Sequence, residues 1–564
     1  MDVEPIFFRR TPPLTPALCH REVKGKSTIH EFDFCFFRGG MRAELPEIFP
    51  LCWERLPPDC LAAAEAARAE ALMSVEFPQF LNELQACREL PGYLPDLARL
   101  ELGRFQLRSQ TLPAQTPPDE CLVNPTLALL EVGWRPLLTL AAGKSGEPEA
   151  VPERLLLWRH PHSGEALESV AEPADLLALK VTAEQLDRRS VADAGGQPVG
   201  VVDAALDRAV TQGLLLAPAA TLTRSFAGSS PASALAEAKQ RAEVFTLQWH
   251  ITHRCDLHCR HCYDRSNQED VSLARGLEIL DQMRDFCRQH HVSGQVSFSG
   301  GNPFLHPDFP ALYQAACDRN LTPAILGNPV GPDQLDEILK IHRPAFFQVS
   351  LEGLQEHNDA IRGRGNFSAV LAFLDLLREK NIYSMVMLTL TRANLDQVLP
   401  LAELLRERVD LFTYNRLAMV GEGASLASPG PEEYRAFCSD YLEARISNPV
   451  MALKDSLLNI ELDARSEPLF GGCTGFGCGA AFNFVSLLPD GQVHACRKFP
   501  SPIGNLKQQD LAETYASETA KAYRRGCREC EDCRLRANCG GCLAVAYGFG
   551  LDPLKEKDPA CFIC

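Results

Sequence analysis

Alternating strand and helix patterns between residues 244 and 417 constrain the fold more than any other feature of the sequence. The segments between the expected strands place apolar residues at helical spacing. Because parallel strands need crossover helices, the alternation predicts an α/β fold, either an open sheet or a partial (β/α)6 barrel, with its chemistry at the carboxyl ends of the strands. Short runs rich in β-branched and aromatic residues mark the strands, at 244–251, 294–300, 322–327, 345–351, 383–391 and 411–417.

A chain of 564 residues is too long for one hydrophobic core. Residues 1–40 show little periodicity, so we expect them to be poorly ordered or to precede a natural start at Met41. The rest divides by composition into a mainly helical N-terminal recognition or scaffold domain at 41–225, a linker at 226–243, the barrel at 244–440 and a small cysteine-rich domain at 441–564.

The net charge and the number of cysteines exclude several classes of protein. The net charge of −17 argues against a nucleic-acid binder, which usually has a basic face. The sequence has no apolar run near the ~20 residues that a membrane helix needs, and no signal-peptide pattern, so we expect a cytoplasmic protein without membrane attachment. In that reducing compartment, 22 cysteines indicate metal or redox chemistry rather than disulfides.

Three cysteines stand together directly after the first expected strand, in the segment ITHRCDLHCRHCYDR. They are Cys255, Cys259 and Cys262. Three thiolates on one loop can hold three irons of a four-iron, four-sulfur cluster and leave the fourth iron open for a ligand. A zinc knuckle is the alternative, but zinc sites usually pair two Cys-x2-Cys units at a longer separation.

The Cys-x3-Cys-x2-Cys spacing is the signature of the radical S-adenosylmethionine (SAM) superfamily, and the chain resembles that family. The resemblance implies that SAM binds the open iron and that one electron cleaves it to a 5′-deoxyadenosyl radical, which abstracts hydrogen from a substrate. It also implies a low-potential electron donor such as flavodoxin or ferredoxin. In relatives, the backbone at the position of His261 meets the adenine.

Two further segments carry the resemblance. Gly300 and Gly301, followed by Asn302, resemble the Gly-Gly-Glu-Pro turn that receives the SAM ammonium group. Asn302 replaces the usual Glu and loses its charge, although its oxygen can still accept a hydrogen bond. A plain turn is the alternative reading of this motif.

The segment from Ser350 to Gly353, which includes Glu352, is similar to the Ser-x-Asp-Gly segment that contacts the SAM ribose. Arg362 follows in a stretch that resembles the family's Arg-Gly segment. The resemblance makes Arg362 a candidate partner for the SAM carboxylate, to which guanidinium offers two parallel donors. A solvated arginine near a helix is the alternative. The sequence does not identify a catalytic acid or base.

Ten cysteines crowd the last 92 residues, where regular periodicity fades, as expected where metal ligation substitutes for a hydrophobic core. Only five residues separate Cys533 from Cys539, too few for a zinc ribbon. The array resembles the SPASM domain, which binds two auxiliary four-iron clusters; a single cluster or zinc are the alternatives. By order in the family, the first set is Cys473, Cys478, Cys496 and Cys542, and the second is Cys530, Cys533, Cys539 and Cys561. Cys527 and Cys564 are surplus, and either could replace an assigned ligand.

The combined resemblance covers residues 245–564 and implies a maturase of ribosomally made peptides. The fused front domain suggests the selenobiotic-type maturases among them. Its reaction would form a thioether or another cross-link in a precursor peptide. Residues 90–217 weakly resemble partner proteins from peptide natural-product clusters and could capture a leader peptide by adding a strand to a sheet edge, or could serve only as a scaffold. The alternatives are a protein Cys or Ser oxidising maturase of the sulfatase-maturating type and a non-catalytic iron–sulfur electron-transfer scaffold.

Overall fold

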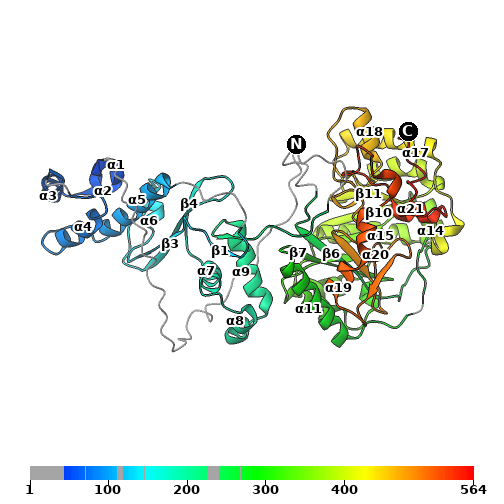
Figure 1. Ribbon diagram of the computed structural model, residues 1–564, viewed down its shortest axis with the longest axis horizontal. Helices are drawn as coiled ribbons and strands as arrows, with labels where there is room; N and C mark the ends of the chain where they lie inside the picture. The colour runs from blue at the N-terminus through cyan, green and yellow to red at the C-terminus, as the bar shows by residue number, and fades with distance from the viewer. Residues whose placement is uncertain are drawn as a thin grey trace. The chain divides into compact units, whose positions relative to one another are not determined.

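The computed structural model describes residues 44–69, 72–110, 118–144, 146–224, 240–266 and 268–563. The chain forms two compact units, Met1–Ala219 and Ala220–Cys564 (Figure 1). The expectations for residues 1–40 and Met41 lie outside the described residues, as does most of the expected linker. None of the described helices is long and apolar enough to cross a membrane.

The first half of unit 1 is helical. Helix α5 is central to it, because its apolar residues, among them Leu94, Leu97 and Leu100, are fully buried against the helices before it. The buried Glu101 fixes this packing by accepting hydrogen bonds from the backbone N–H groups of Leu51 and Cys52 at 2.9 and 3.0 Å. The helices are α1 (Leu45–Ile48), α2 (Pro50–Arg55), α3 (Pro58–Ala69), α4 (Phe77–Gln85) and α5 (Leu94–Ser109).

The second half of unit 1 combines strands with helices. Strands β2, β3 and β4 form an antiparallel sheet in that order, and β1 pairs antiparallel with β5. The central strand β3 buries Leu155, Leu156 and Leu157 in succession, so both faces of the sheet are covered. The elements are β1 (Leu122–Val123), β2 (Ala128–Val132), α6 (Leu137–Ala141), β3 (Glu153–Arg159), β4 (Ala166–Val170), α7 (Pro173–Ala183), α8 (Arg188–Gly195), α9 (Val199–Thr211) and β5 (Leu215–Leu216).

Unit 2 is built on a nine-stranded sheet in the order β11-β10-β9-β8-β7-β6-β12-β13-β14. The six predicted strands are β6 to β11, within two residues at each end, and they pair in parallel, which confirms the predicted α/β fold. The strands are β6 (Val244–Thr252), β7 (Ser293–Gly300), β8 (Thr322–Leu326), β9 (Phe347–Ser350), β10 (Ser384–Leu390), β11 (Leu411–Arg416), β12 (Phe484–Leu487), β13 (Gln492–His494) and β14 (Pro502–Asn505).

Crossover helices follow the parallel strands, as in Figure 1, where they lie against the green and yellow strands. Helices α11, α12 and α15 pack on β7, β8 and β9–β10. The helices are α11 (Leu273–Gln289), α12 (Phe309–Cys317), α13 (Pro332–Ile341), α14 (Gln355–Arg362), α15 (Asn366–Glu379), α16 (Val398–Leu405), α17 (Pro431–Ser447), α18 (Leu458–Ala464), α19 (Leu511–Ala516), α20 (Glu518–Arg525) and α21 (Leu543–Gly548). Short 3-10 turns are η2 (Pro303–Leu305), η3 (Arg392–Gln397), η4 (Gly421–Ser425), η5 (Gly472–Thr474) and η6 (Arg528–Cys530).

The cysteine-rich C-terminal segment shares the hydrophobic core of the barrel. Phe482, Val485, Leu487 and Val493 are fully buried in the same cluster as the barrel side chains. Strand β12 pairs in parallel with β6 and so continues the barrel sheet. The expectation that metal ligation replaces a hydrophobic core here is therefore wrong. The sequence of this segment shows no regular periodicity because its strands are only three or four residues long.

Candidate active site

The loop after β6 carries Cys255, Cys259 and Cys262 at the carboxyl ends of the parallel strands. Cys255 is exposed, and the other two are half-buried. Neighbouring loops anchor the backbone: Arg260 N–H donates to the carbonyl of Ile361 at 3.0 Å, and Glu422 N–H donates to the carbonyl of Cys262 at 2.8 Å. These contacts fix the second half of the loop, and the three thiols lie close enough to affect one another electrostatically.

Gly300 and Gly301 let the end of β7 approach this loop closely. Gly300 has a φ of +140°, a conformation that favours glycine. A Cβ atom on Gly301 would lie 2.1 Å from the carbonyl oxygen of Arg254 and 2.7 Å from the Cβ of Cys255. Only glycine fits here without moving the cysteine loop, so the glycine pair is more than a plain turn.

The next residue, Asn302, is buried and faces the cysteine loop. Its Nδ2 donates to Oδ1 of Asp256 at 3.2 Å, while its own Oδ1 accepts from the backbone N–H of Phe304 at 3.3 Å. Asn328, which follows β8, donates to the same Asp256 oxygen at 2.6 Å and lies 3.6 Å from Sγ of Cys255. Asp256 and Asn328 are not predicted from the sequence. The position of Asn328 just after a parallel strand is the signal that could have indicated it.

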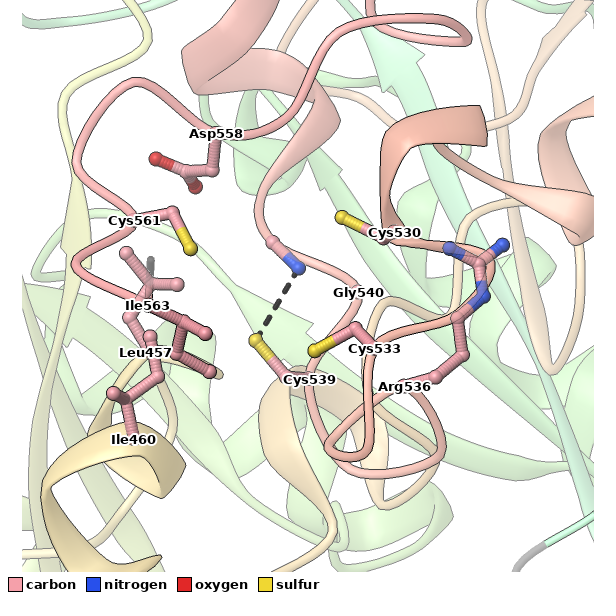
Figure 2. Close-up of a pocket in the computed structure, with 11 residues that line it drawn as sticks. Leu457, Ile460, Cys530, Cys533, Arg536, Cys539, Gly540, Asp558, Cys561 and Ile563 are labelled. Atoms are coloured by element: carbon pink, nitrogen blue, oxygen red, sulfur yellow. Dashed lines mark hydrogen bonds between the residues drawn. The ribbon is translucent and has the colours of Figure 1, made fainter. Parts of the chain in front are cut away.

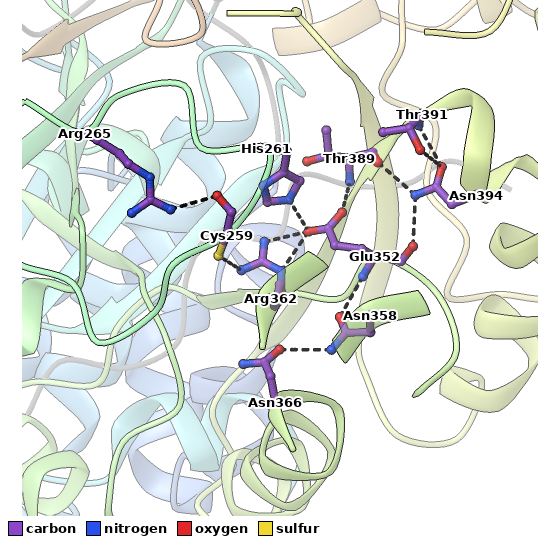
Figure 3. Close-up of polar contacts among 10 residues, drawn as sticks. All are labelled: Cys259, His261, Arg265, Glu352, Asn358, Arg362, Asn366, Thr389, Thr391 and Asn394. Carbon is purple, nitrogen blue, oxygen red and sulfur yellow. Dashed lines mark hydrogen bonds and ion pairs between the residues drawn. The ribbon is translucent and has the colours of Figure 1, made fainter. Parts of the chain in front are cut away.

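Glu352 is the centre of a buried polar cluster beside the loop (Figure 3). Its Oε1 accepts from Nε and Nη2 of Arg362 at 2.8 and 2.6 Å and lies 2.8 Å from Nε2 of His261. Its Oε2 accepts from the backbone N–H of Thr389 at 2.8 Å. Burial alone would raise the pKa of Glu352, but the nearby His261 and Arg362 outweigh it and lower the pKa to about 2.

Arg362 connects this cluster to a cysteine thiol. Its remaining nitrogen, Nη1, lies 3.6 Å from Sγ of Cys259. Ser350 ends β9, two residues before Glu352, and is half-buried. The structure thus brings His261, Glu352 and Arg362 together next to the cysteine loop, and their contacts with SAM stay predictions.

The four thiols of the first predicted auxiliary set lie near one another. Its members are Cys473, Cys478, Cys496 and Cys542, whose thiols are close enough to affect one another electrostatically. Burial, reinforced by these neighbouring thiols, raises the pKa of Cys478 to about 12 and that of Cys496 to about 11. Cluster binding must therefore expel protons from this site.

The second predicted set lines a pocket in which the four sulfur atoms face one space (Figure 2). Its members are Cys530, Cys533, Cys539 and Cys561. Gly541 N–H donates to Sγ of Cys539 at 3.4 Å. Of the two surplus cysteines, Cys564 lies outside the described residues. Cys527 is buried beside Cys530, where its Sγ donates to the carbonyl of Lys555 at 3.4 Å.

These donor sets fit iron–sulfur clusters. Cysteine thiolates are the usual ligands of four-iron clusters, and each binds a different iron. In the described part of the chain, no three His, Cys, Asp or Glu side chains surround a position for a single metal ion. Thiols spread around a shared space are what a cluster needs, since the irons that they bind occupy separate corners.

A buried ion cluster behind the pocket is not predicted from the sequence. Arg416, the last residue of β11, donates from Nε to Asp455 at 2.8 Å and from Nη1 and Nη2 to Asp558 at 2.8 and 2.5 Å. All three side chains are almost completely buried. Asp558 is also part of the pocket wall. A charged residue at the end of an otherwise uncharged strand is the only signal in the sequence.

A second feature that sequence reasoning misses links the two cysteine regions. The guanidinium of Arg497, next to Cys496, lies 5.1 Å from the ring centroid of Tyr263, which follows Cys262. Its Nη1 donates to Oγ of Ser299 at 3.3 Å, beside the glycine pair. This places a cation between the mid-chain cysteine loop and the first auxiliary set.

The family comparisons agree with this geometry. Residues 249–405 match the model of the radical SAM superfamily, and residues 478–542 match that of SPASM, an iron–sulfur cluster-binding domain. One curated relative is the AdoMet-dependent heme synthase of Methanosarcina barkeri, which is 26% identical over 347 residues that cover 56% of this chain and 95% of that protein. A second is the antilisterial bacteriocin subtilosin biosynthesis protein AlbA of Bacillus subtilis, 24% identical over 311 residues that cover 52% of this chain and 65% of that protein. A third is the mycofactocin maturase MftC of Mycolicibacterium smegmatis, 26% identical over 350 residues that cover 56% of this chain and 82% of that protein. Residues 249–405 are therefore a radical SAM domain and residues 478–542 a SPASM domain, and the chain is an enzyme whose cofactors are SAM and iron–sulfur clusters.

Proposed function

We propose that this enzyme modifies a ribosomally made peptide, forming a thioether or another cross-link by hydrogen abstraction. The observation that carries the proposal is unit 1, which lies outside both family-model matches and contains, in its described residues, a three-stranded sheet that ends at strand β4. Two of the three relatives are named for bacteriocin biosynthesis and for maturation, which supports a peptide substrate.

The cysteine loop supplies the ligands for the radical chemistry. Cys255, Cys259 and Cys262 would hold the catalytic cluster, and the backbone of Gly300 and Gly301 would receive SAM beside it. When bound, the cluster and SAM supply a 5′-deoxyadenosyl radical for hydrogen abstraction, with electrons from a donor such as flavodoxin or ferredoxin. The two auxiliary sets would hold clusters that accept the electron left on the substrate or bind a substrate thiol.

Strand β4 is our candidate for the leader-peptide site. Within the described residues, β4 pairs only with β3 and lies at the sheet edge. Ala171 N–H donates to the carbonyl of Arg154 on the β3 side, so the N–H of Val170 points away from β3. Val170 is also exposed. An extended peptide that adds a strand to this edge would accept that hydrogen bond.

Peptides encoded beside this gene are the probes for the test. The anaerobic enzyme, with SAM and a reductant, should convert one of them to a product that has lost a pair of hydrogen atoms, while SAM gives 5′-deoxyadenosine and methionine. Val170→Pro removes the outward N–H and should weaken binding of that peptide at least about tenfold. Val170→Ala keeps the N–H and should bind like the wild type. Equal binding by all three proteins would refute the β4 site.

A haem-type tetrapyrrole is the second candidate substrate, favoured by the match to the heme synthase, which spans 95% of that relative. The same anaerobic assay distinguishes the two. Turnover of an iron porphyrin precursor without turnover of any neighbouring peptide would replace the peptide proposal.

A further inference from the structure

We propose that Glu352 and Arg362 act on the catalytic cysteine loop, where they set the charge around the sulfur of Cys259 and thereby the reduction potential of the cluster. The resemblance assigns these residues to SAM, but their contacts favour this positioning role. The inference rests on the cysteine trio as cluster ligands and needs no peptide, so it can fail independently of the proposed function.

The carboxylate of Glu352 has little capacity left for a ligand. Its side chain is only 1% exposed, and both of its oxygens already have partners within the protein. Oε1 contacts Arg362 and His261, and Oε2 accepts from the N–H of Thr389. The backbone around Glu352 is held as well, because its N–H donates to Asn358 and its carbonyl accepts from Asn394 (Figure 3). A carboxylate held in this way orients its neighbours rather than a ribose.

The guanidinium of Arg362 is committed in the same way. Nε and Nη2 both donate to Glu352, which fixes the plane of the group. With that plane fixed, Nη1 lies 3.6 Å from Sγ of Cys259, within reach of a hydrogen bond to sulfur. The side chain is only 11% exposed, so water screens its charge weakly. Arg362 therefore presents one donor and one positive charge to a predicted cluster ligand.

Hydrogen bonds and charges near the sulfurs are among the factors that set the potential of an iron–sulfur cluster. Reduction adds negative charge, so a nearby cation favours the reduced state and a nearby anion disfavours it. Glu352 and Arg362 nearly cancel each other's charge. Removing Arg362 leaves Glu352 with only His261 beside it, and removing Glu352 leaves Arg362 without its anion. The two removals should therefore shift the potential in opposite directions.

The test is an anaerobic redox titration of the reconstituted full-length enzyme, followed by electron paramagnetic resonance of the signal that changes when SAM is added. Arg362→Gln leaves the Glu352 anion and should make the midpoint potential more negative. Glu352→Gln leaves the Arg362 cation and should make it more positive. Arg319→Gln, which breaks the ion pair between Arg319, just after α12, and Asp281 of α11, is the matched control and should leave the potential unchanged.

SAM binding provides the second measurement. If Arg362 acts through Cys259, Arg362→Gln should change the dissociation constant of SAM by less than about threefold, whereas loss of a direct carboxylate contact should raise it at least about tenfold. Shifts of opposite sign with near-normal SAM binding would support the proposal. Unchanged potentials, or shifts of the same sign, would overturn the proposal. Loss of the SAM-responsive cluster from both variants would also overturn it, because that result would show that the two residues only hold the structure of the site.

Discussion

Asp558 accepts a hydrogen bond of 2.8 Å at Oδ2 from the backbone N–H of Cys542, so one carboxylate touches both auxiliary sets. Cys542 belongs to the first predicted set, and Asp558 lines the pocket of the second (Figure 2). Arg416 holds the same carboxylate from the end of β11. The two predicted cluster sites are therefore coupled through a buried ion pair that reaches back into the barrel.

Arg416→Met should destabilise the protein strongly. The change leaves the buried carboxylates of Asp455 and Asp558 without their counterion, which should cost roughly 3–5 kcal/mol of the free energy of unfolding. Urea titration of the protein measures this loss. Arg408→Met, which removes a half-exposed partner of Asp375, should cost less than about 1 kcal/mol. Equal effects of the two variants would show that the buried ion cluster stabilises the fold no more than an exposed ion pair does.

Replacing Cys255, Cys259 and Cys262 together with alanine should abolish SAM cleavage but leave the auxiliary sets able to bind iron. After anaerobic reconstitution, the triple variant should contain about four fewer irons per chain than the wild type, since one four-iron cluster is lost. Iron and sulfide analysis checks the count. Cys87→Ala, at an exposed cysteine of unit 1, should change neither measurement. Loss of all iron, or of none, would contradict the ligand assignment.

Gly301→Ala should prevent the cysteine loop from forming its site. The added methyl group would lie 2.1 Å from the oxygen of Arg254, a backbone atom that cannot rotate away. We expect the variant to lose the SAM-responsive cluster signal. Gly331→Ala is the matched control, because a Cβ there meets nothing within 4 Å, and it should bind SAM and iron normally. A normal SAM-responsive signal from Gly301→Ala would refute the close approach.

The carboxylate of Asp359 should make stability depend on pH in acid. Burial tends to raise its pKa, but hydrogen bonds from the backbone N–H groups of Phe367 and Gly365, at 2.9 and 2.7 Å, hold the pKa below its ordinary 3.8. Because the pKa is lower in the folded state, this contribution is present above pH 3.8 and is lost as the pH falls through the folded pKa.

Asp359→Ala should therefore lower the free energy of unfolding of the cluster-free protein by about 1 kcal/mol at pH 7. The difference from the wild type should shrink below pH 3.8, which urea titrations at neutral and acid pH can measure. A difference that stays constant across this range would contradict the role of the charge.

The barrel and the mid-chain cysteine trio could be predicted because their signals are local. Each parallel strand is a short apolar run between helical periods, and Cys255, Cys259 and Cys262 stand within eight residues of one another. The two auxiliary sets came from the order of cysteines in the family that the chain resembles, and their roles as ligands stay predictions. The pairings around the sites could not be predicted. Glu352 contacts Thr389, and Arg416 contacts Asp558, at separations of 37 and 142 residues, and no periodicity records such contacts.

The continuation of the barrel sheet into the C-terminal strands could not be predicted from the sequence either. Strand β12 has four residues, all of them buried, so it shows no alternation of apolar and polar side chains. Its partner β6 lies more than 200 positions earlier in the chain, and only the folded sheet shows that the two are neighbours.

The pairing of β12 with β6 limits how far apart the predicted cluster sites can lie. Four register pairs join β12 to β6, from Phe484 opposite Thr246 to Leu487 opposite Trp249. The mid-chain cysteine loop follows β6, and β12 leads through β13 toward Cys496. Backbone hydrogen bonds between β6 and β12 thus limit the separation of the mid-chain and C-terminal thiol groups, and a movement that carried one predicted cluster site away from the other would first have to break these hydrogen bonds.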